Sequence, residues 1–243
     1  MSKSFLLIGG SSDIALQVTA QLLAHGHTVT ILARDQTRVA HLQEQGVHIL
    51  LGDALDEEAV SRAVLEASAR GDEGLVGVAH LVGSIGLRPP HAMPLDQFRE
   101  IVETNLVSAF VTLKIAGKSM LKQSSGRLVF TSSVAGSHGL TNHEAIAAAK
   151  GGVEAMVRAA ASTYAQRGLR VNAVAPGLTD TRLSEGIMRS DAIREASIQM
   201  IPTKRSSQAI EIASTIVWLL TAAPDNLTGQ ILHVDGGMAT LRG

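Results

Sequence analysis

The sequence has no cysteine and very few aromatic residues. Without cysteine, the protein forms no disulfides and offers no thiolate to a metal or a redox reaction. Aromatic residues make up 2% of the 243 residues, which leaves few rings on which nucleic-acid bases could stack. The formal net charge of −1 and the absence of basic blocks also argue against a nucleic-acid partner. We therefore expect neither a disulfide framework nor bound nucleic acid.

Long hydrophobic runs are missing as well. The longest apolar stretch, Ile210 to Leu220, contains one glutamate and two hydroxyl residues and is shorter than the roughly 18 residues of a membrane span. The first four residues lead directly into the apolar run Phe5–Ile8, so we expect no signal peptide. A hydrophobic content of 45% is enough for a sizeable core. These features predict a soluble, cytoplasmic globular protein that does not bind membranes.

Short apolar runs alternate with longer amphipathic stretches along the whole chain. The expected strands are Phe5–Ile8, Thr28–Leu32, Val47–Leu50, Val76–Val82, Arg127–Thr131, Arg170–Ala175 and Ile231–Val234. The expected helices are Ile14–Ala24, a stretch through Val39 and Leu42, Glu57–Ala69, Leu95–Leu121, Ala145–Ala165 and Glu211–Leu220. This alternation predicts a doubly wound α/β sheet of about seven parallel strands with helices on both faces. No repeat or linker divides residues 1–243, so we expect a single domain.

A glycine-rich turn follows the first expected strand, at the edge where such sheets bind ligands. The residues of this turn are Gly9, Gly10, Ser11, Ser12, Asp13 and Ile14. A turn of this kind lets the backbone approach a pyrophosphate at a helix N-terminus. The Rossmann pattern has three glycines, and here Asp13 and Ala15 take the second and third positions. A carboxylate beside a phosphate is repulsive unless it turns away to cap the helix, and an ordinary βα turn is the alternative.

The second and third expected strands end in residues that suit the adenosine half of a dinucleotide. The second ends at Arg34, where an acidic residue would select NAD, so Arg34 favours a 2′-phosphate and therefore NADP over NAD. Arg38 lies four residues further on and is expected to assist. Asp53, after the third strand, is a candidate partner for the adenine amino group. A solvated surface arginine and an acidic helix start are the alternative interpretations of Arg34 and Asp53.

Four further motifs occur in a fixed order along the chain. They are Glu103–Leu106 with Asn105, Gly126–Gly136 with Ser133, Arg170–Gly177 and Leu227–Gly237. Together with the glycine turn they resemble the short-chain dehydrogenase/reductase family over residues 5–238. The resemblance implies a Rossmann-type fold, a nicotinamide cofactor and interconversion of a carbonyl and an alcohol on a small or medium substrate.

The resemblance also implies an active site made of Asn, Ser, Tyr and Lys. In the family, Ser hydrogen-bonds to the substrate oxygen and Tyr transfers the proton. Lys holds the nicotinamide ribose and lowers the tyrosine pKa, and Asn orders a water molecule. Asn105, Ser133 and Lys150 match, but Ile146 stands where the tyrosine is expected. The only tyrosine, Tyr164, lies fourteen residues after Lys150, almost four helical turns away. Asn105 has the alternative role of bracing a helix kink.

A histidine is the candidate replacement for the missing acid. His143 lies three residues before Ile146 and seven before Lys150, so the three are expected on one helix face. An imidazole titrates near neutral pH and can carry a proton. His138 is a second candidate, and solvent exposure is the alternative for both. Thr141 and Glu144 have the spacing of a capping box at the start of this helix.

The remaining candidate residues follow from the resemblance. Gly83 matches one residue of a family element whose asparagine is replaced here by His80. The expected cofactor contacts are Lys150, in the helix before the sixth strand, and Pro176, Gly177, Thr179 and Thr181, which follow that strand. Residues 178–204 are expected to form a substrate lid whose apolar residues line the pocket: Leu183, Ile187, Met188, Ile193, Met200 and Ile201. The histidines show no metal-ligand spacing, so no metal is expected.

Three functional hypotheses remain open from the sequence. The first is an NADP-preferring carbonyl or alcohol oxidoreductase, the second a dinucleotide-binding sensor or structural subunit without turnover, and the third a reductase of activated C=C bonds. The missing tyrosine favours the last two, whereas Ser133 and Lys150 favour the first and third. Family members commonly pair the two long helices across a two-fold axis, so we expect a homotetramer, or failing that a dimer.

Overall fold

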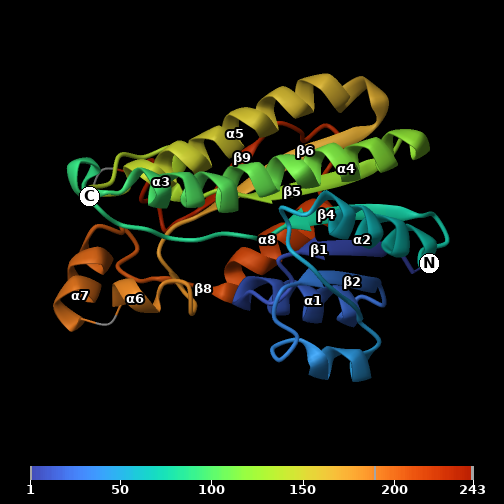
Figure 1. Cartoon of the computed structure of the whole chain (residues 1–243), viewed down its shortest axis with the longest axis horizontal. Helices are drawn as coiled ribbons and strands as arrows, with labels where there is room; N and C mark the ends of the chain where they lie inside the picture. Colours follow the sequence, from blue (N-terminus) through green and yellow to red (C-terminus); the bar gives the residue numbers. More distant parts are fainter. Residues whose placement is uncertain (1, 189, 242–243) are drawn as a thin grey trace.

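The structure is a computed structural model that describes residues 2–188 and 190–241. Its centre is a seven-stranded sheet in the order β3-β2-β1-β4-β5-β6-β9, with every neighbouring pair parallel (Figure 1). The strands are β1 (Ser4–Ile8), β2 (Thr28–Ala33), β3 (His48–Leu51), β4 (Leu75–His80), β5 (Gly126–Thr131), β6 (Leu169–Pro176) and β9 (Ile231–Val234). The predicted doubly wound α/β fold is confirmed.

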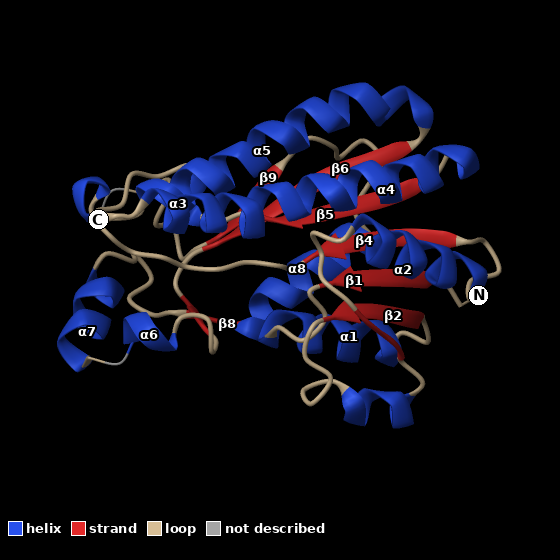
Figure 2. Cartoon of the chain, in the orientation of Figure 1, coloured by secondary structure: helices blue, strands red, loops and turns tan. Residues whose placement is uncertain are grey.

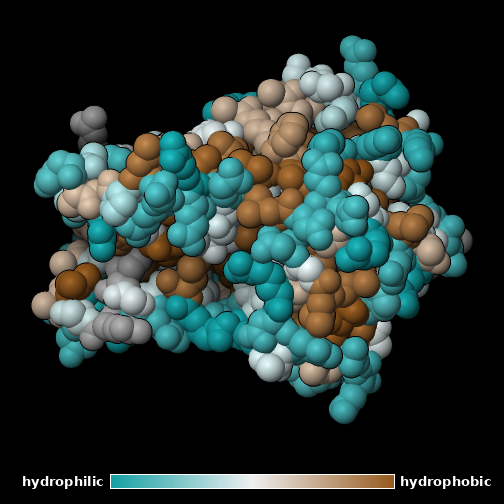
Figure 3. Space-filling model, viewed as in Figure 1, coloured by the Kyte–Doolittle hydropathy of each residue, from teal (hydrophilic) through white to brown (hydrophobic). Residues whose placement is uncertain are grey.

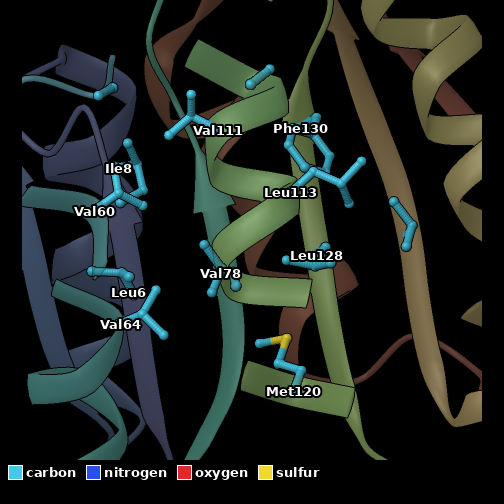
Figure 4. Packing of buried hydrophobic residues seen from close by; sticks show 14 of the residues in the cluster. Leu6, Ile8, Val60, Val64, Val78, Val111, Leu113, Met120, Leu128 and Phe130 are labelled. Carbon is cyan, nitrogen blue, oxygen red and sulfur yellow. The ribbon is translucent and has the colours of Figure 1, made fainter. Parts of the chain in front are cut away.

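Helices cover both faces of the sheet because the strands are apolar on both sides (Figure 2). One face carries α2 (Glu57–Ala69), α4 (Ser108–Gln123) and α5 (Glu144–Tyr164). The other carries α1 (Asp13–Ala24) and α8 (Ala209–Thr221). Alternate residues of β1 point to opposite faces, so that Leu6 and Ile8 pack under α2 while Phe5 and Leu7 pack in the second core. Figure 4 shows the first of these cores, between β1, β4 and β5 and the helices α2 and α4.

The expected helix over Leu95–Leu121 is in fact three consecutive segments. They are α3 (Leu95–Val102), the π-helical turn η3 (Glu103–Val107) and α4. Within the turn, the side-chain Nδ2 of Asn105 donates to the carbonyl of Ile101 at 2.9 Å, the acceptor that a regular helix offers to the Asn105 backbone. A side chain inserted in this way interrupts the helical ladder. The chain is therefore helical over the predicted range, but the π-helical turn interrupts its α-helical hydrogen bonds and places Asn105 in the interior.

Smaller elements also differ from expectation. The stretch through Val39 and Leu42 forms a 3₁₀ helix, η1 (Ala40–Gln45), and the other 3₁₀ turns are η2 (Pro90–Ala92), η4 (Val134–Gly136) and η5 (Ala165–Arg167). The region of the expected lid contains β7 (Thr179–Asp180), α6 (Glu185–Met188) and α7 (Asp191–Gln199), and β7 pairs with β8 (Ser207–Gln208). Two-residue strands are too short for a hydrophobic pattern to reveal. Figure 1 shows α6 and α7 on the side toward which the strands of the large sheet point.

The surface mixes polar and apolar side chains. Figure 3 shows apolar atoms among polar ones on the face that carries α2, α4 and α5. The large exposed apolar side chains of these helices include Leu65 of α2 and Phe110 of α4, which are 70% and 54% exposed. In the part of the chain that the structure describes, no helix is both long enough and apolar enough to cross a bilayer.

Candidate active site

A cavity of about 790 Å³ opens at the carboxyl ends of the parallel strands. Parallel strands that end together bring residues distant in sequence to one edge of the sheet. Most residues proposed for the site from the sequence lie on the wall of this cavity: Gly9, Ser11, Ser12, Asp13, Ile14, Arg34, Asp53, Gly83, Asn105, Ser133, His143, Lys150, Pro176, Gly177, Thr179 and Thr181. The cavity is therefore the place where the two halves of the predicted site, the glycine turn and the Ser133–Lys150 pair, meet.

Lys150 is held at the back of the cavity by backbone carbonyls. Its Nζ donates to the carbonyl of Thr131 at 2.8 Å and to that of Val82 at 3.5 Å. The residue is 4% exposed, and this burial lowers the pKa of the ammonium group to about 8. The lysine is thus fixed in position, and it loses its proton closer to neutral pH than a solvated helix lysine does.

Asn105 and Lys150 converge on the backbone of Gly83. A Cβ atom placed on Gly83 would lie 3.3 Å from Asn105 Oδ1 and 3.7 Å from Lys150 Nζ. The Asn105 amide also joins the π-helical turn to Ser84, donating to Ser84 Oγ at 2.9 Å and accepting from Ser84 N at 3.1 Å. Asn105 therefore braces the helix interruption, as one interpretation of the sequence proposed, and it also lines the cavity.

The two neighbouring serines after β5 have different environments. Ser133 begins the turn η4, where its Oγ accepts from Ala135 N at 3.2 Å and faces the cavity. Because Oγ only accepts in that bond, its proton is available to a ligand oxygen. The Ser132 residue is 3% exposed, and its Oγ donates to Glu154 Oε1 at 2.8 Å. The Ser133 hydroxyl is thus available to a ligand in the cavity, whereas the Ser132 hydroxyl is bound to Glu154 in the interior.

Glu154 is a residue of this region that the sequence analysis missed. It is 4% exposed, and its Oε1 accepts from both Ser132 and Ser137, the latter at 2.9 Å, so that it ties the η4 loop to α5. Arg158 lies one helical turn further on, with Nη1 3.8 Å from Glu154 Oε2. A signal was present, since Glu154 lies four residues after Lys150 and shares its buried helix face.

His143 and Ile146 lie on the cavity wall at the start of α5. Ile146 is 4% exposed and packs in a small apolar cluster that includes Ile101 and Ala149. His143 is the N-cap residue of α5, and its Nδ1 lies 2.7 Å from the carbonyl of Thr141. A carbonyl can only accept, so Nδ1 carries a proton and Nε2 is the nitrogen left for a ligand. His138 is exposed and does not belong to the cavity wall.

Two predictions about α5 need correction. The capping box between Thr141 and Glu144 does not form, because the chain turns at Asn142 with a φ of +63° and the helix begins only at Glu144. His143 consequently precedes the helix and is not part of its first turn. Tyr164, at the opposite end of α5, lies against Gly117 of α4 and is absent from the cavity wall, as its spacing predicted.

Two side chains of the glycine turn, those of Ser12 and Asp13, make hydrogen bonds within the protein. Ser12 caps α1, with its Oγ accepting from Ala15 N at 3.1 Å, so helix capping is not what turns the Asp13 carboxylate away from the turn. The Asp13 carboxylate instead lies 2.7 Å from Nη2 of Arg38 and accepts from the backbone N of Arg182 at 2.8 Å. Burial opposes ionisation of Asp13, but the hydrogen bonds and charges of the two arginines outweigh it and lower its pKa.

Gly9 adopts a φ of +83°, and a Cβ atom there would lie 2.9 Å from Val82 Cγ2, so glycine is required at the start of this turn. Arg34 and Asp53 lie on the cavity wall beyond it. The Arg34 side chain is 73% exposed, and its Nη1 is 3.6 Å from Asp53 Oδ2. Asp53 Oδ1 also accepts from Leu55 N at 2.9 Å. Arg34 therefore keeps most of its donors available to a ligand.

The segment over 178–204 contributes only part of the expected apolar lining. Leu183 and Met200 line the cavity. Ile193 is 54% exposed and Ile201 is buried against Val134 and Met238, so these two were assigned to the lining wrongly. The side chains of Ile187 and Met188 lie outside the described residues. Thr179 Oγ1 donates to the Gly177 carbonyl at 3.0 Å, and Thr181 bonds Ser184.

His80 braces the centre of the sheet at the position where the family pattern has asparagine. Its Nε2 lies 3.0 Å from Ser108 Oγ, and Ser108 donates its own proton to the Thr104 carbonyl at 2.6 Å. Nε2 is therefore the protonated nitrogen. Burial lowers the pKa of His80 to about 3, so the ring is neutral.

Among the described residues, no three His, Asp or Glu side chains gather as a metal site would require.

Comparison with known proteins agrees with this architecture. The family model described as "Enoyl-(Acyl carrier protein) reductase" matches residues 9–239. The chain is 31% identical to the 3-oxoacyl-[acyl-carrier-protein] reductase MabA of Mycobacterium tuberculosis over 241 residues, 98% of this chain and 93% of that protein. A short-chain type dehydrogenase/reductase from Mycobacterium ulcerans superposes with a TM-score of 0.92 at 28% identity, covering 100% of this chain and 93% of the other. The structure of ElxO with NADP bound superposes with a TM-score of 0.91 at 25% identity, covering 99% and 100%. The chain belongs to the short-chain dehydrogenase/reductase family of oxidoreductases.

Proposed function

We propose that this protein is an NADP(H)-dependent oxidoreductase that interconverts a carbonyl and an alcohol on a small to medium substrate. The observation that carries the proposal is the single cavity that joins the glycine turn to Ser133 and Lys150. Two features fit a dinucleotide at its outer end. The glycine turn lies on the cavity wall at the N-terminus of α1, where a pyrophosphate would be favoured, and the exposed Arg34 guanidinium suits a 2′-phosphate.

The inner end of the cavity fits the nicotinamide ribose and ring. Lys150 would hold the ribose hydroxyls, and Pro176, Gly177, Thr179 and Thr181 would contact the carboxamide and the pyrophosphate. NADPH, when bound, supplies a hydride to the substrate carbon. The ElxO relative is described with NADP bound, which supports the same choice here.

Side chains of this protein would stabilise the charge on the substrate oxygen and supply its proton. Ser133 donates its hydroxyl proton in a hydrogen bond to the carbonyl oxygen, where negative charge develops as hydride reaches the carbon. Lys150 adds a positive charge nearby while it is protonated. His143 as imidazolium donates the proton that converts the oxyanion into a hydroxyl group, and Nε2 is the nitrogen from which it leaves.

Two alternatives each have a supporting observation. Reduction of an activated C=C bond places the proton on carbon and needs no phenol beside the oxygen, and the matching family model is described as an enoyl reductase. A dinucleotide-binding protein without turnover is favoured by Ile146, whose apolar side chain is packed at the position of the family's proton donor.

One screen separates these functions. NADPH oxidation would be followed against a panel of ketones and enones, and NADPH binding would be measured by fluorescence titration. Turnover of ketones supports the proposal, turnover of enones alone supports the C=C reductase, and tight binding without any turnover supports the binding protein. In an active enzyme, His143→Ala lowers kcat/KM, whereas His138→Ala, which alters an exposed histidine outside the cavity, leaves it unchanged.

We also propose a homotetramer that buries α4 and α5 across two-fold axes, with a dimer as the alternative. The exposed Phe110 of α4 offers apolar surface for such a contact. Outside its buried face, α5 carries several small residues, which permit close approach of helices: Ala147, Ala148, Gly151, Gly152, Ala155 and Ala159. The cytoplasmic location stays a prediction.

A further inference from the structure

The most unusual feature of the cavity is an ion pair built into the glycine turn. Asp13 occupies a position where the Rossmann pattern has glycine, and Arg38 reaches it from the segment after β2. One guanidinium nitrogen of Arg38 donates to the Ser11 carbonyl, and the other lies 2.7 Å from Asp13 Oδ1. The Arg38 and Asp13 side chains are 17% and 25% exposed, so the pair is shielded from solvent on most sides.

The position of Asp13 makes an unpaired charge there unfavourable for ligand binding. The carboxylate belongs to the first residue of α1, where the helix would otherwise attract a pyrophosphate. A negative charge at this position would repel every dinucleotide, with or without a 2′-phosphate. The Arg38 guanidinium cancels that charge at hydrogen-bonding distance.

The two arginines that follow β2 therefore differ in how many of their hydrogen-bond donors remain available to a ligand. Arg38 uses both terminal nitrogens within the chain, on Ser11 and Asp13. Arg34 has a 73% exposed side chain and a single 3.6 Å contact with Asp53, itself 45% exposed. Only Arg34 combines a location after β2 with donors that are free for a phosphate group.

We propose that Arg38 acts as the counter-ion of Asp13 and makes the turn acceptable to any nicotinamide dinucleotide, whereas Arg34 alone selects the 2′-phosphate. This inference rests on the proposed dinucleotide-binding function. It replaces the expectation that Arg38 assists Arg34 in recognising NADP. Arg38 is thus a positioning residue that sets the overall affinity for the cofactor, and Arg34 sets the ratio of NADPH to NADH affinity.

The second oxygen of Asp13 has its own role. Oδ2 accepts from the backbone N of Arg182 at 2.8 Å, which joins the start of the 178–204 segment to the glycine turn. Asparagine at position 13 retains an oxygen for this bond and removes only the charge. Asp13→Asn is therefore the substitution that isolates the electrostatic effect from the attachment of that segment.

The test is a pair of fluorescence titrations, with NADPH and with NADH, on each folded variant. Arg38→Ala should weaken both cofactors by the same factor, about tenfold, because it exposes the Asp13 charge to the pyrophosphate. Arg34→Ala should weaken NADPH and leave NADH unchanged. Asp13→Asn combined with Arg38→Ala should restore both affinities to near those of the parent. Arg62→Ala, which removes an exposed arginine of α2 outside the cavity, controls for the change in net charge.

Other results would overturn the inference. If Arg38→Ala weakened NADPH while NADH stayed at the parent value, Arg38 would be a 2′-phosphate ligand. If the double variant remained as weak as Arg38→Ala, the Asp13 charge would not be the cause. Asp13→Asn alone provides a second test should Arg38→Ala fail to fold. It should tighten both cofactors equally, and unchanged affinities would contradict the inference. A parent protein that bound neither cofactor would instead refute the proposed function itself.

Discussion

Restoring a phenol at position 146 tests whether this active site still supports ordinary carbonyl reduction. Ile146 lies one helical turn before Lys150 and on the wall of the same cavity. Its neighbours Asn105, Ser133 and Lys150 line the cavity as well. We therefore expect Ile146→Tyr to raise the reductase activity on a generic activated ketone.

The size of the gain follows from what a general acid contributes. A positioned acid is worth about 10²–10⁴ in rate, which corresponds to about 3–5 kcal/mol of activation free energy. Burial leaves Lys150 with a pKa of about 8, so its cation is present at neutral pH and lowers the pKa of a nearby phenol from its usual value of about 10. Ile146 is 4% exposed, so the larger ring also costs about 1–3 kcal/mol of folding free energy. We expect a gain near the lower end, about 10²-fold.

The assay measures kcat/KM for NADPH-dependent ketone reduction by the parent, Ile146→Tyr and Ile146→Phe. The phenylalanine variant introduces the same ring without the hydroxyl, so it reproduces the packing change and the loss of stability. NADPH titrations verify that all three proteins bind the cofactor. If the tyrosine variant binds NADPH but is no faster than the phenylalanine variant, the view that only the phenol is missing is refuted.

Four further predictions concern selectivity, ionisation, stability and assembly. Arg34→Asp should narrow or reverse the preference for NADPH over NADH in paired titrations, and a parent that binds NADH more tightly would contradict this. NADPH affinity should fall as pH rises through about 8, because Lys150 loses its proton there, and the fall should be absent in Lys150→Met. The same lowered pKa makes the unfolded chain bind more protons between about pH 8 and 10.5, so this group's contribution to the free energy of unfolding should rise with pH across that window. Glu154→Ala should lower the free energy of unfolding by about 2 kcal/mol in urea denaturation, because the buried Ser132 hydroxyl loses a charged acceptor and the Ser137 hydroxyl loses the same partner, whereas Glu144→Ala, at an exposed position, should not. Light scattering should give the mass of a tetramer or dimer of the 25.4 kDa chain, and a monomer mass at micromolar concentration would exclude both.

The order of strands and helices could be predicted from local pattern. Strands such as β1 and β6 are buried on both faces, so they appear in the sequence as continuous apolar runs bounded by turns. The parallel topology then brings the ends of these strands to one edge. For this reason residues as far apart as Gly9 and Gly177 could be assigned to one site, and the structure places both on the same cavity wall.

The sequence did not reveal which partner each polar group would find. Capping of α1 was one way to accommodate the Asp13 carboxylate, but Ser12 caps the helix, and the partner of Asp13 lies 25 residues further along the chain. Asn105 interrupts a helix that periodicity predicts to be continuous. Local patterns record hydrophobicity and intrinsic preference, whereas the choice of a hydrogen-bond partner depends on three-dimensional proximity.

The sequence by itself therefore determined the fold class, the edge of the sheet that carries the site, and the absence of tyrosine from position 146. Only the tertiary structure decided that the Ser132 hydroxyl donates to the buried carboxylate of Glu154, and that Glu154 joins α5 to the η4 loop. It also decided that both terminal nitrogens of Arg38 are bound within the chain, whereas the exposed Arg34 makes only a 3.6 Å contact with Asp53. The physical reason is that burial and ion pairing arise from the packing of elements distant in sequence, and no spacing within one element encodes them.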